Sequence, residues 1–233
     1  MTAIMPPGRE NGEDQGVFKP FSNAFPLLLL AALPLALQGC AARVVLVMKP
    51  CLPAVHTNGS GKGIFVAVFQ DGRDGSAGGS DAGLRVGEMP RRSIRFLGVP
   101  LLLDAPPAAK LRCAVKGLVD AAGYRPLARA PDPFDETPTL AGTLRRFSVE
   151  NVPGASPWEV VAGMEFELSV LRHGETLLTR DFEAEQSAAL GAGGFPKVSD
   201  YQTATDRAVE ECLAQAAAFI GTPAFSDAVA GRR

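Results

Sequence analysis

The stretch that decides the fold is residues 158–187, WEVVAGMEFELSVLRHGETLLTRDFEAEQS. Apolar and polar side chains alternate in its first half, where Met164, Phe166, Leu168 and Val170 are separated by Glu165, Glu167 and Ser169. This alternation is the period of a β-strand with one buried face. Arg172-His-Gly-Glu175 interrupts the pattern with residues that favour a tight turn. The stretch therefore predicts an antiparallel hairpin with strands at 158–171 and 176–187.

The segments on either side of this hairpin predict a third strand and a helix. Leu140 to Glu150 is apolar enough to pair with the hairpin. After a glycine-rich loop, a helix is expected from about Tyr201 to Ile220, entered through Ser199 or Asp200 and ended by Gly221 and Pro223. Residues 222–233 are expected to form a flexible tail.

The region before residue 140 predicts one buried strand, one helix and a returning strand. Gly63–Gln70 is a short, almost wholly apolar run, which is typical of a strand buried on both faces. Asp104 precedes two prolines and predicts the N-cap of a helix. This helix should run from about residue 106 to Ala122 and end at Gly123. Residues 124–128 then predict the returning strand.

The order of these elements predicts the fold class. A strand, a helix, a strand, three meandering strands and a final helix favour an α+β fold with a mixed β-sheet and two helices packed on one face. A single domain is expected at residues 62–221. Residues 84–87 and 93–100 add extended segments. Arg43–Lys49, rich in β-branched residues, predicts either a short strand or an apolar segment laid over the domain.

An uncharged run, AFPLLLLAALPLAL, occupies residues 24–37. It is shorter than the about 20 apolar residues that a membrane-spanning helix needs, and it contains two prolines. Its length and position are typical of the apolar centre of a secretory signal. We therefore expect residues 1–39 to be a signal peptide and exclude a transmembrane helix here.

The end of this run, Leu37-Gln38-Gly39-Cys40, resembles the lipobox of bacterial lipoproteins. The resemblance implies cleavage before Cys40 and lipidation of its thiol, with residues 40–61 as a lipidated N-terminal segment and linker. Ala41, in place of Asp, resembles the sorting signal for the outer membrane. The expected location is the outer membrane, with the protein lipid-anchored and facing the periplasm.

Composition argues against several classes of function. The 233 residues carry a formal charge of −2, so no basic excess exists to hold nucleic acid. His56 and His173, the two histidines, both stand beside turn-forming residues, which leaves little material for a metal site or a catalytic triad. Ser148, Ser169 and Asp181 lack a Gly-x-Ser-x-Gly elbow. We expect no catalytic residues, no cofactor and no metal, and hence a protein that is not an enzyme.

Residues 59–63, GSGKG, invite comparison with a phosphate-binding loop. That motif needs glycine where His56 stands and serine or threonine where Gly63 stands. The comparison therefore fails, and no nucleotide site is expected.

Three cysteines remain once Cys40 is set aside as the lipidation site. Cys212 lies at the centre of an apolar helical face, which predicts a buried free thiol. Cys113 falls on the opposite face of its helix from the apolar positions. A disulfide between Cys51 and Cys113 is left open, because spacing alone does not decide it.

Three short motifs carry a resemblance to a family: FVAVFQDGRDG at 65–75, LRVGEMP at 84–90 and AAGYRPL at 121–127. Together they resemble the YajG-like outer-membrane lipoproteins of proteobacteria. Asp71 and Arg73 occupy the Asp-x-Arg positions of that family and Gly87 its later glycine. This chain departs from the pattern in a glycine-rich insertion at 75–83 and in a long apolar segment at 88–103. The family has no established activity, so the resemblance implies location and fold.

Asp71 and Arg73 admit a structural and a functional interpretation. In the structural one, the arginine in an exposed turn satisfies backbone carbonyls or a neighbouring carboxylate. In the functional one, the pair binds a ligand. Residues 96–103, FLGVPLLL, similarly predict either a buried strand or an exposed patch that binds a partner.

These expectations combine into two hypotheses on function. The first is a membrane-anchored envelope lipoprotein with a non-enzymatic accessory or scaffolding role, held to the membrane through its lipid and contacting an envelope protein partner. The alternative is an auxiliary lipoprotein of a transporter that binds apolar or lipidic ligands. An apolar pocket between the helices and the sheet would favour the alternative.

Overall fold

The computed structural model describes residues 43–49, 55, 57, 59, 61–74, 82–90, 98–132, 135–152, 159–189 and 195–232. All of them fall within one compact unit, Ala42–Arg233. The predicted signal peptide, its cleavage site and Cys40 lie outside the described residues and stay predictions.

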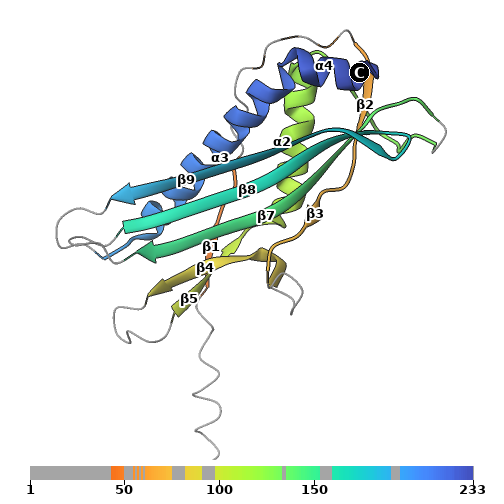
Figure 1. Ribbon diagram of the computed structural model, residues 1–233. Helices are drawn as coiled ribbons and strands as arrows, with labels where there is room; N and C mark the ends of the chain where they lie inside the picture. Colours follow the sequence, from red (N-terminus) through yellow and green to blue (C-terminus); the bar gives the residue numbers. More distant parts are fainter. Residues whose placement is uncertain are drawn as a thin grey trace, which may run out of the picture. The chain divides into compact units, whose positions relative to one another are not determined.

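Three long strands form the antiparallel meander that the sequence predicts (Figure 1). They are β7 (Thr139–Val152), β8 (Glu159–Arg172) and β9 (Glu175–Ala189). The turn between β8 and β9 consists of His173 and Gly174, both with positive φ (50° and 77°), as a tight hairpin turn requires. His173 is thus a turn residue.

Short strands complete a mixed sheet of nine strands within the described residues. The edge of β7 opposite β8 pairs with β2 (Gly63–Val66), β3 (Gln70–Asp71) and β4 (Arg85–Pro90), all parallel to it. A short 3₁₀ turn, Ala82–Leu84, precedes β4. Beyond these strands lie β6 (Arg125–Leu127) beside β2, β5 (Gly98–Leu103) beside β4 and β1 (Val44–Leu46) beside β5.

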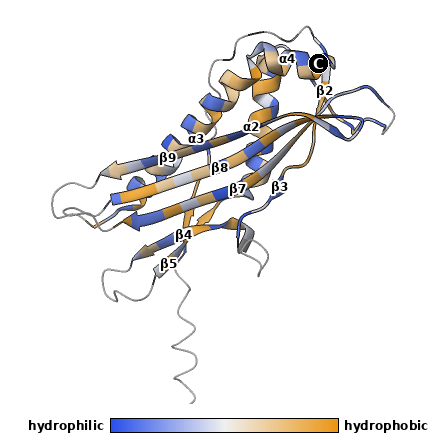
Figure 2. Ribbon diagram, in the orientation of Figure 1, coloured by the Kyte–Doolittle hydropathy of each residue, from blue (hydrophilic) through white to orange (hydrophobic). Residues whose placement is uncertain are grey.

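Two helices, α2 (Pro107–Ala121) and α3 (Val198–Ile220), lie on the same face of this sheet (Figure 1). The predicted α+β fold is therefore confirmed. Hydrophobic and hydrophilic residues are mixed along the three long strands (Figure 2), because alternate side chains point to the helices and to the opposite face. No helix among the described residues is long and apolar enough to cross a membrane.

The helix start predicted at Asp104 is wrong in its detail. Pro106 holds the N-cap position of α2 and makes no capping hydrogen bond through its side chain. The Asp104 carboxylate instead accepts a hydrogen bond from the Met48 N–H at 3.2 Å. The Asp104 carboxylate, which the sequence predicts as the cap of α2, thus binds a backbone N–H from a distant segment of the chain.

The expected flexible tail at 222–233 is also wrong, because Pro223–Ala230 forms a further helix, α4. Thr222 caps it by accepting a hydrogen bond from the Phe225 N–H at 3.2 Å, and Gly231 closes it with φ of 71°. Phe225 is fully buried and packs edge-on against Phe219 and Tyr124. Pro223, expected only to stop α3, begins this helix.

The expected domain start at residue 62 needs correction as well. Arg43–Lys49 supplies strand β1, one of the two structures that the sequence left open. Leu46 and Met48 are buried in the core of the sheet. The linker predicted at 40–61 therefore includes a segment that belongs to the folded domain.

The strand predicted at Gly63–Gln70 is broken in two. Val66 pairs with Leu140 and Gln70 with Thr143, so this segment holds one residue more than its partner. The extra residue bulges, and Val68 turns outward with 77% of its surface exposed. The prediction that this strand is buried on both faces is wrong for that reason.

Candidate functional site

The two residues that carry the family resemblance, Asp71 and Arg73, form a buried clamp. The Arg73 Nε and Nη2 atoms donate to the two carboxylate oxygens of Asp71 at 2.8 and 2.7 Å. The same guanidinium donates to the backbone oxygens of Gly83 and Arg85 at 2.7 and 3.1 Å. Arg73 is only 8% exposed. The clamp thus fixes the end of β3 to the start of β4.

These contacts favour the structural interpretation of the pair, with one correction. The arginine does satisfy carbonyls and a carboxylate, but it is buried and not in an exposed turn. The hydrogen bond from Arg73 is the largest influence on the pKa of Asp71 and lowers it, against the opposing effect of burial. A bidentate ion pair with two further carbonyl contacts leaves the guanidinium committed within the fold.

Gly87, the third residue of the resemblance, stands where β4 meets β7. It pairs with Val149, and a Cβ atom on Gly87 would lie 1.9 Å from the Val149 carbonyl oxygen. The close backbone approach therefore requires glycine. All three residues of the resemblance thus have structural roles in joining β3, β4 and β7.

A second group of contacts holds the segment that follows the predicted lipidation site. Lys110 on α2 donates to the Met48 carbonyl at 2.9 Å and pairs with Asp104, whose other oxygen accepts from the Met48 N–H. Gln202 on α3 forms two hydrogen bonds with the backbone of Val47, accepting at 3.0 Å and donating at 2.7 Å. Both helices thus secure the residues just after β1.

The pKa of Asp104 reflects these contacts. Burial works to raise it, but the hydrogen bonds from Lys110 and Met48 outweigh burial and lower the pKa from 3.8.

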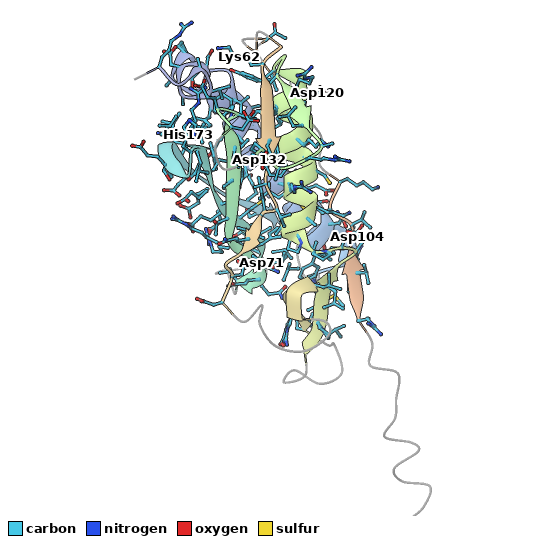
Figure 3. All side chains as sticks on the ribbon, turned by 90° about the vertical axis from the view of Figure 1, so that its right-hand side faces the viewer. Lys62, Asp71, Asp104, Asp120, Asp132 and His173 are labelled. Carbon is cyan, nitrogen blue, oxygen red and sulfur yellow. The ribbon has the colours of Figure 1, made fainter. Side chains whose placement is uncertain are left out.

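Asp104 and Asp120 lie near opposite ends of α2 (Figure 3). Sequence reasoning missed the roles of Lys110 and Gln202, since a polar residue in a helix gives no sign of a distant backbone partner.

The start of α3 is joined to the far end of β7 by a partly buried hydrogen bond. The hydroxyl of Tyr201, which is fully buried, donates to Asn151 Oδ1 at 2.5 Å. Asn151 in turn donates to the Glu88 carbonyl of β4 at 3.0 Å. Burial raises the pKa of Tyr201 to about 12, so the hydroxyl stays protonated as a donor.

The face of the meander opposite the helices carries a network of charges. Arg145 contacts three carboxylates, those of Glu165, Glu167 and Asp181. Arg146 contacts two more, Glu183 at 2.6 Å and Glu185 at 3.5 Å. Both arginines point to this face because a register shift between Leu144 and Arg146 interrupts the alternation of β7.

This network combines two like-charged pairs with two arginines. Glu165 lies opposite Glu183, and Glu167 opposite Asp181, which is unfavourable without a nearby cation. Arg146 reaches β9 by passing over Gly163, where a Cβ atom would lie only 2.9 Å from the guanidinium. The arrangement is an ion-pair network on a solvent-facing sheet, and no group of His, Cys, Asp or Glu among the described residues has the geometry to hold a metal.

The residues considered for hydrolysis do not form a catalytic set within the described structure. The Ser169 hydroxyl lies 2.9 Å from the Thr179 hydroxyl, and Asp181 pairs with Arg145. Ser148 lies on β7 opposite Gly163. His173 is placed at the β8–β9 turn, and His56 lies outside the described residues.

The segment that resembles a phosphate-binding loop uses its backbone donors elsewhere. The N–H groups of Gly59 and Gly61 donate to the carbonyls of Ala122 and Gly123 at 2.8 and 3.0 Å. These bonds tie the segment to the end of α2. Gly59 allows this close packing, since a Cβ on it would lie 2.3 Å from the Gly123 carbonyl carbon.

Two of the cysteines are described. Cys212 is a buried free thiol, as predicted, and its sulfur donates to the Met164 carbonyl at 3.4 Å. Burial raises its pKa to about 12, so it is not a reactive thiolate. Cys113 is exposed on α2. Cys51 lies outside the described residues, so the Cys51–Cys113 disulfide stays a prediction.

The apolar segment 96–103 is a buried strand in its described part. Residues 98–103 form β5, and Leu101, Leu102 and Leu103 are each at most 3% exposed. The exposed-patch interpretation is therefore wrong for these residues.

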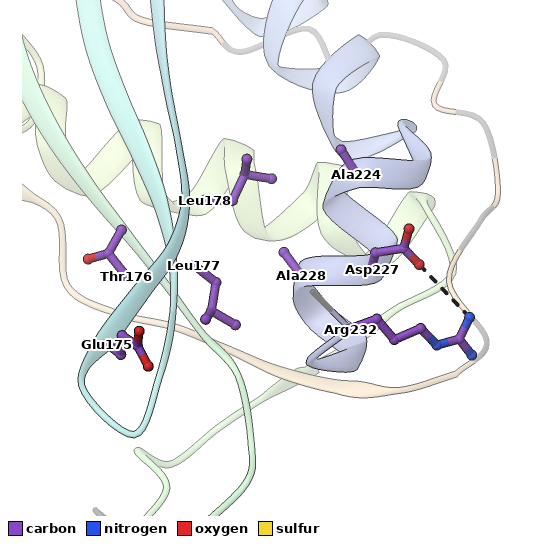
Figure 4. A pocket seen from close by; sticks show the side chains of 8 residues that line it. All are labelled: Glu175, Thr176, Leu177, Leu178, Ala224, Asp227, Ala228 and Arg232. Carbon is purple, nitrogen blue, oxygen red and sulfur yellow. Dashed lines mark ion pairs between the residues drawn. The ribbon is translucent and has the colours of Figure 1, made fainter.

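Two of the pockets on the described surface are open to solvent. One, of about 350 Å³, lies between β9 and α4 (Figure 4) and is lined by Leu177 and Leu178 but also by Glu175, Asp227 and Arg232. The other, of about 300 Å³, lies beside the β8–β9 turn near His173. Both are at the lower limit of ligand-site volumes and are open to solvent, and the first carries a mixed, charged lining.

No family model and no curated protein sequence matches this chain. Among solved structures, a protein of Xanthomonas campestris in the DUF330 family is similar to it, with 12% identity, a TM-score of 0.51, and coverage of 76% of this chain and 93% of that chain. At this identity the likeness is one of fold. A homologue of a neuraminyllactose-binding hemagglutinin from Helicobacter pylori shares 6% identity over 79% of this chain and 98% of that chain, with a TM-score of 0.43. A lipoprotein of Neisseria meningitidis shares 11% identity over 57% and 88%, with a TM-score of 0.26.

Proposed function

We propose that the protein is a membrane-anchored envelope lipoprotein with a non-enzymatic accessory or scaffolding role. Cys40 is its lipidation site, residues 1–39 are its signal peptide, and the domain that follows faces the periplasm from the outer membrane. An envelope protein is its expected partner, and neither a cofactor nor nucleic acid takes part.

The observation that carries this proposal is where the folded domain begins. Val44, the first residue of β1, stands four positions after Cys40, so cleavage there would remove the whole apolar run and leave β1 intact. Leu46 and Met48 are core residues, so a cleavage site a few residues later would damage the fold. The predicted processing site and the start of the domain are thus compatible with each other.

The polar chemistry of the described residues also supports a non-enzymatic role. Arg73 and Asp104 are each committed to contacts that join strands or secure β1. The carboxylates of the outer face pair with Arg145 and Arg146. Such groups stabilise a scaffold, and a transporter auxiliary that encloses a lipid gains no specific support from the two open pockets.

The proposal is tested by comparing the wild-type chain with Cys40→Ser in a bacterial host. Wild type should be processed, incorporate radiolabelled palmitate and fractionate with the outer membrane. Cys40→Ser should remain unprocessed and unlabelled. Cys113→Ser, which changes an exposed cysteine of the folded domain, is the matched control and should behave as wild type. Soluble, unlabelled wild-type protein would contradict the proposal.

A further inference from the structure

Exposed apolar side chains gather at one end of the domain. We define the β1 end as the end of the sheet at which β1 begins, β7 ends and α3 begins. The exposed large hydrophobic residues of the described chain are Val45, Val47, Val68, Val152, Phe195 and Val198. Five of them belong to or adjoin three elements: Val45 and Val47 lie in and just after β1, Val152 ends β7, and Phe195 and Val198 lie just before and at the start of α3. These five are each 38–49% exposed.

Contacts between the three elements bring these residues to the same end. Gln202, one helical turn after Val198, forms both of its backbone hydrogen bonds with Val47. Tyr201 of the same helix donates to Asn151, the neighbour of Val152. The first turn of α3 is thus held between the end of β1 and the end of β7.

The chain outside the structure limits what can cover this end. Three peptide steps separate Cys40 from Arg43, the first described residue of the domain. Fully extended, they span about 10 to 11 Å. The polar headgroup region on one side of a bilayer is about 5 to 8 Å thick. A lipid on Cys40 would therefore keep the start of β1 within a short distance of the membrane.

We propose that the β1 end rests on the lipid surface that holds the Cys40 anchor, with its exposed valines and Phe195 in contact with the interfacial region. This inference rests on the proposed lipidation and deepens it by assigning the face of the domain that meets the membrane. The acyl chains supply attachment, and the apolar side chains fix orientation. The domain is then held upright, with the β8–β9 turn and α4 directed away from the membrane.

The outer-face charges are consistent with this orientation. Asp181, Glu183 and Glu185 lie on the face of β9 that points away from the helices, where they pair with Arg145 and Arg146. A charged face is costly to desolvate, so it favours water over the lipid interface. The lipid surface therefore fits the β1 end better than the exposed face of the meander.

Lipid quenching tests the proposal on the full lipidated chain. The protein is reconstituted into vesicles of phosphatidylethanolamine and phosphatidylglycerol with brominated acyl chains. Cys51 and Cys113 are replaced by serine, and an environment-sensitive fluorophore is attached to Val198→Cys. The matched control carries the fluorophore on Thr179→Cys, which is exposed on β9 near the β8–β9 turn. We expect loss of fluorescence at Val198→Cys and no loss at Thr179→Cys.

A second pair of variants tests whether the quenching depends on the exposed valines of β1. Val45→Asp combined with Val47→Asp should abolish quenching at position 198 while the protein stays bound through its lipid. Val68→Asp, an exposed valine away from the β1 end, should leave quenching unchanged. Circular dichroism of each variant checks the fold.

The outcomes separate the inference from the proposed function. A lipidated, vesicle-bound protein without quenching at position 198 would overturn the orientation and leave the lipoprotein proposal standing. Crosslinking of two position-198 cysteines in an unlabelled sample, together with no quenching in the labelled one, would overturn it in favour of a second copy at this end. An unmodified Cys40 on soluble protein would overturn both.

Discussion

The two ends of the domain are stabilised in different ways. At the β1 end, side chains of α2 and α3 hold the segment after β1 through its backbone, and five large apolar side chains stay exposed. At the opposite end, which we call the turn end, α4 covers the sheet and Phe225 is fully buried. Arg172 there binds the carbonyls of Glu136 and Ala230 at 2.8 and 3.2 Å. Apart from Val68, the large apolar side chains that stay exposed in the described chain thus lie at the β1 end, while α4 and Phe225 cover apolar surface at the turn end.

This difference indicates which end is free to meet another surface. A folded domain that leaves apolar residues exposed at one end and buries them at the other has a directed surface.

Removing the aromatic side chain that secures the turn end should cost the most. Phe225→Ala deletes a fully buried ring in contact with Phe219 and Tyr124, and we expect a loss of about 3 to 5 kcal/mol in the free energy of unfolding. Val198→Ala at the β1 end, where the side chain is 44% exposed, is the control and should change it by less than about 1 kcal/mol. Urea denaturation measures both. Equal losses would contradict the comparison.

Adding one methyl group where β4 meets β7 should have the next largest effect. Gly87→Ala forces a Cβ against the Val149 carbonyl, so we expect a loss of about 1 to 3 kcal/mol as the two strands separate. Gly83→Ala meets open space and is the control. The same urea titration applies, and a neutral Gly87→Ala would show that β4 is free to move away from β7.

The polar attachment of β1 should weaken in acid. The pKa of Asp104 is lowered from 3.8 in the folded state, so its stabilising contribution is present above that value and is lost as the pH falls through the folded pKa. Asp104→Asn should cost about 1 kcal/mol near neutral pH and flatten this part of the pH dependence. Asp132→Asn, an exposed control, should keep the wild-type profile. If Asp104→Asn and wild type showed the same dependence of stability on pH, the Asp104 carboxylate would not be the group that stabilises this segment.

The charged face between the two ends should contribute least. Arg146 and its partners are 36–65% exposed, so Arg146→Ala should cost less than about 1 kcal/mol. The loss should shrink further in high salt, because these charges are screened. Thermal denaturation at two salt concentrations measures it, with Arg180→Ala on β9 as control. A large loss of stability that does not depend on salt would contradict this, because it would mean that the ion pairs of this face contribute strongly to the fold.

The comparison also explains which features could be predicted from the sequence. The meander could be predicted because apolar and polar residues alternate regularly from Met164 to Val170. The end of α2 could be predicted from Gly123. The α4 helix was missed because Thr222 and Pro223 are compatible both with the end of α3 and with the start of a new helix. The break between β2 and β3 depends on the spacing of partners on β7, which no local pattern contains.

The candidate site was less predictable than the fold. Asp71 and Arg73 were identified as a pair, but burial of the guanidinium depends on two carbonyls ten and twelve residues away. The hold of Gln202 on Val47 joins residues 155 positions apart. Long-range backbone partners of this kind follow from topology, which local sequence determines only in part.

The mass of the N-terminal peptide of the mature protein, isolated from the membrane of the bacterium that makes it, decides whether the domain is anchored. We expect a peptide that begins at Cys40 and carries acyl chains on its thiol, ahead of β1. A peptide that begins elsewhere, or a Cys40 without lipid, would contradict the anchored lipoprotein and with it the assignment of the β1 end to the membrane surface.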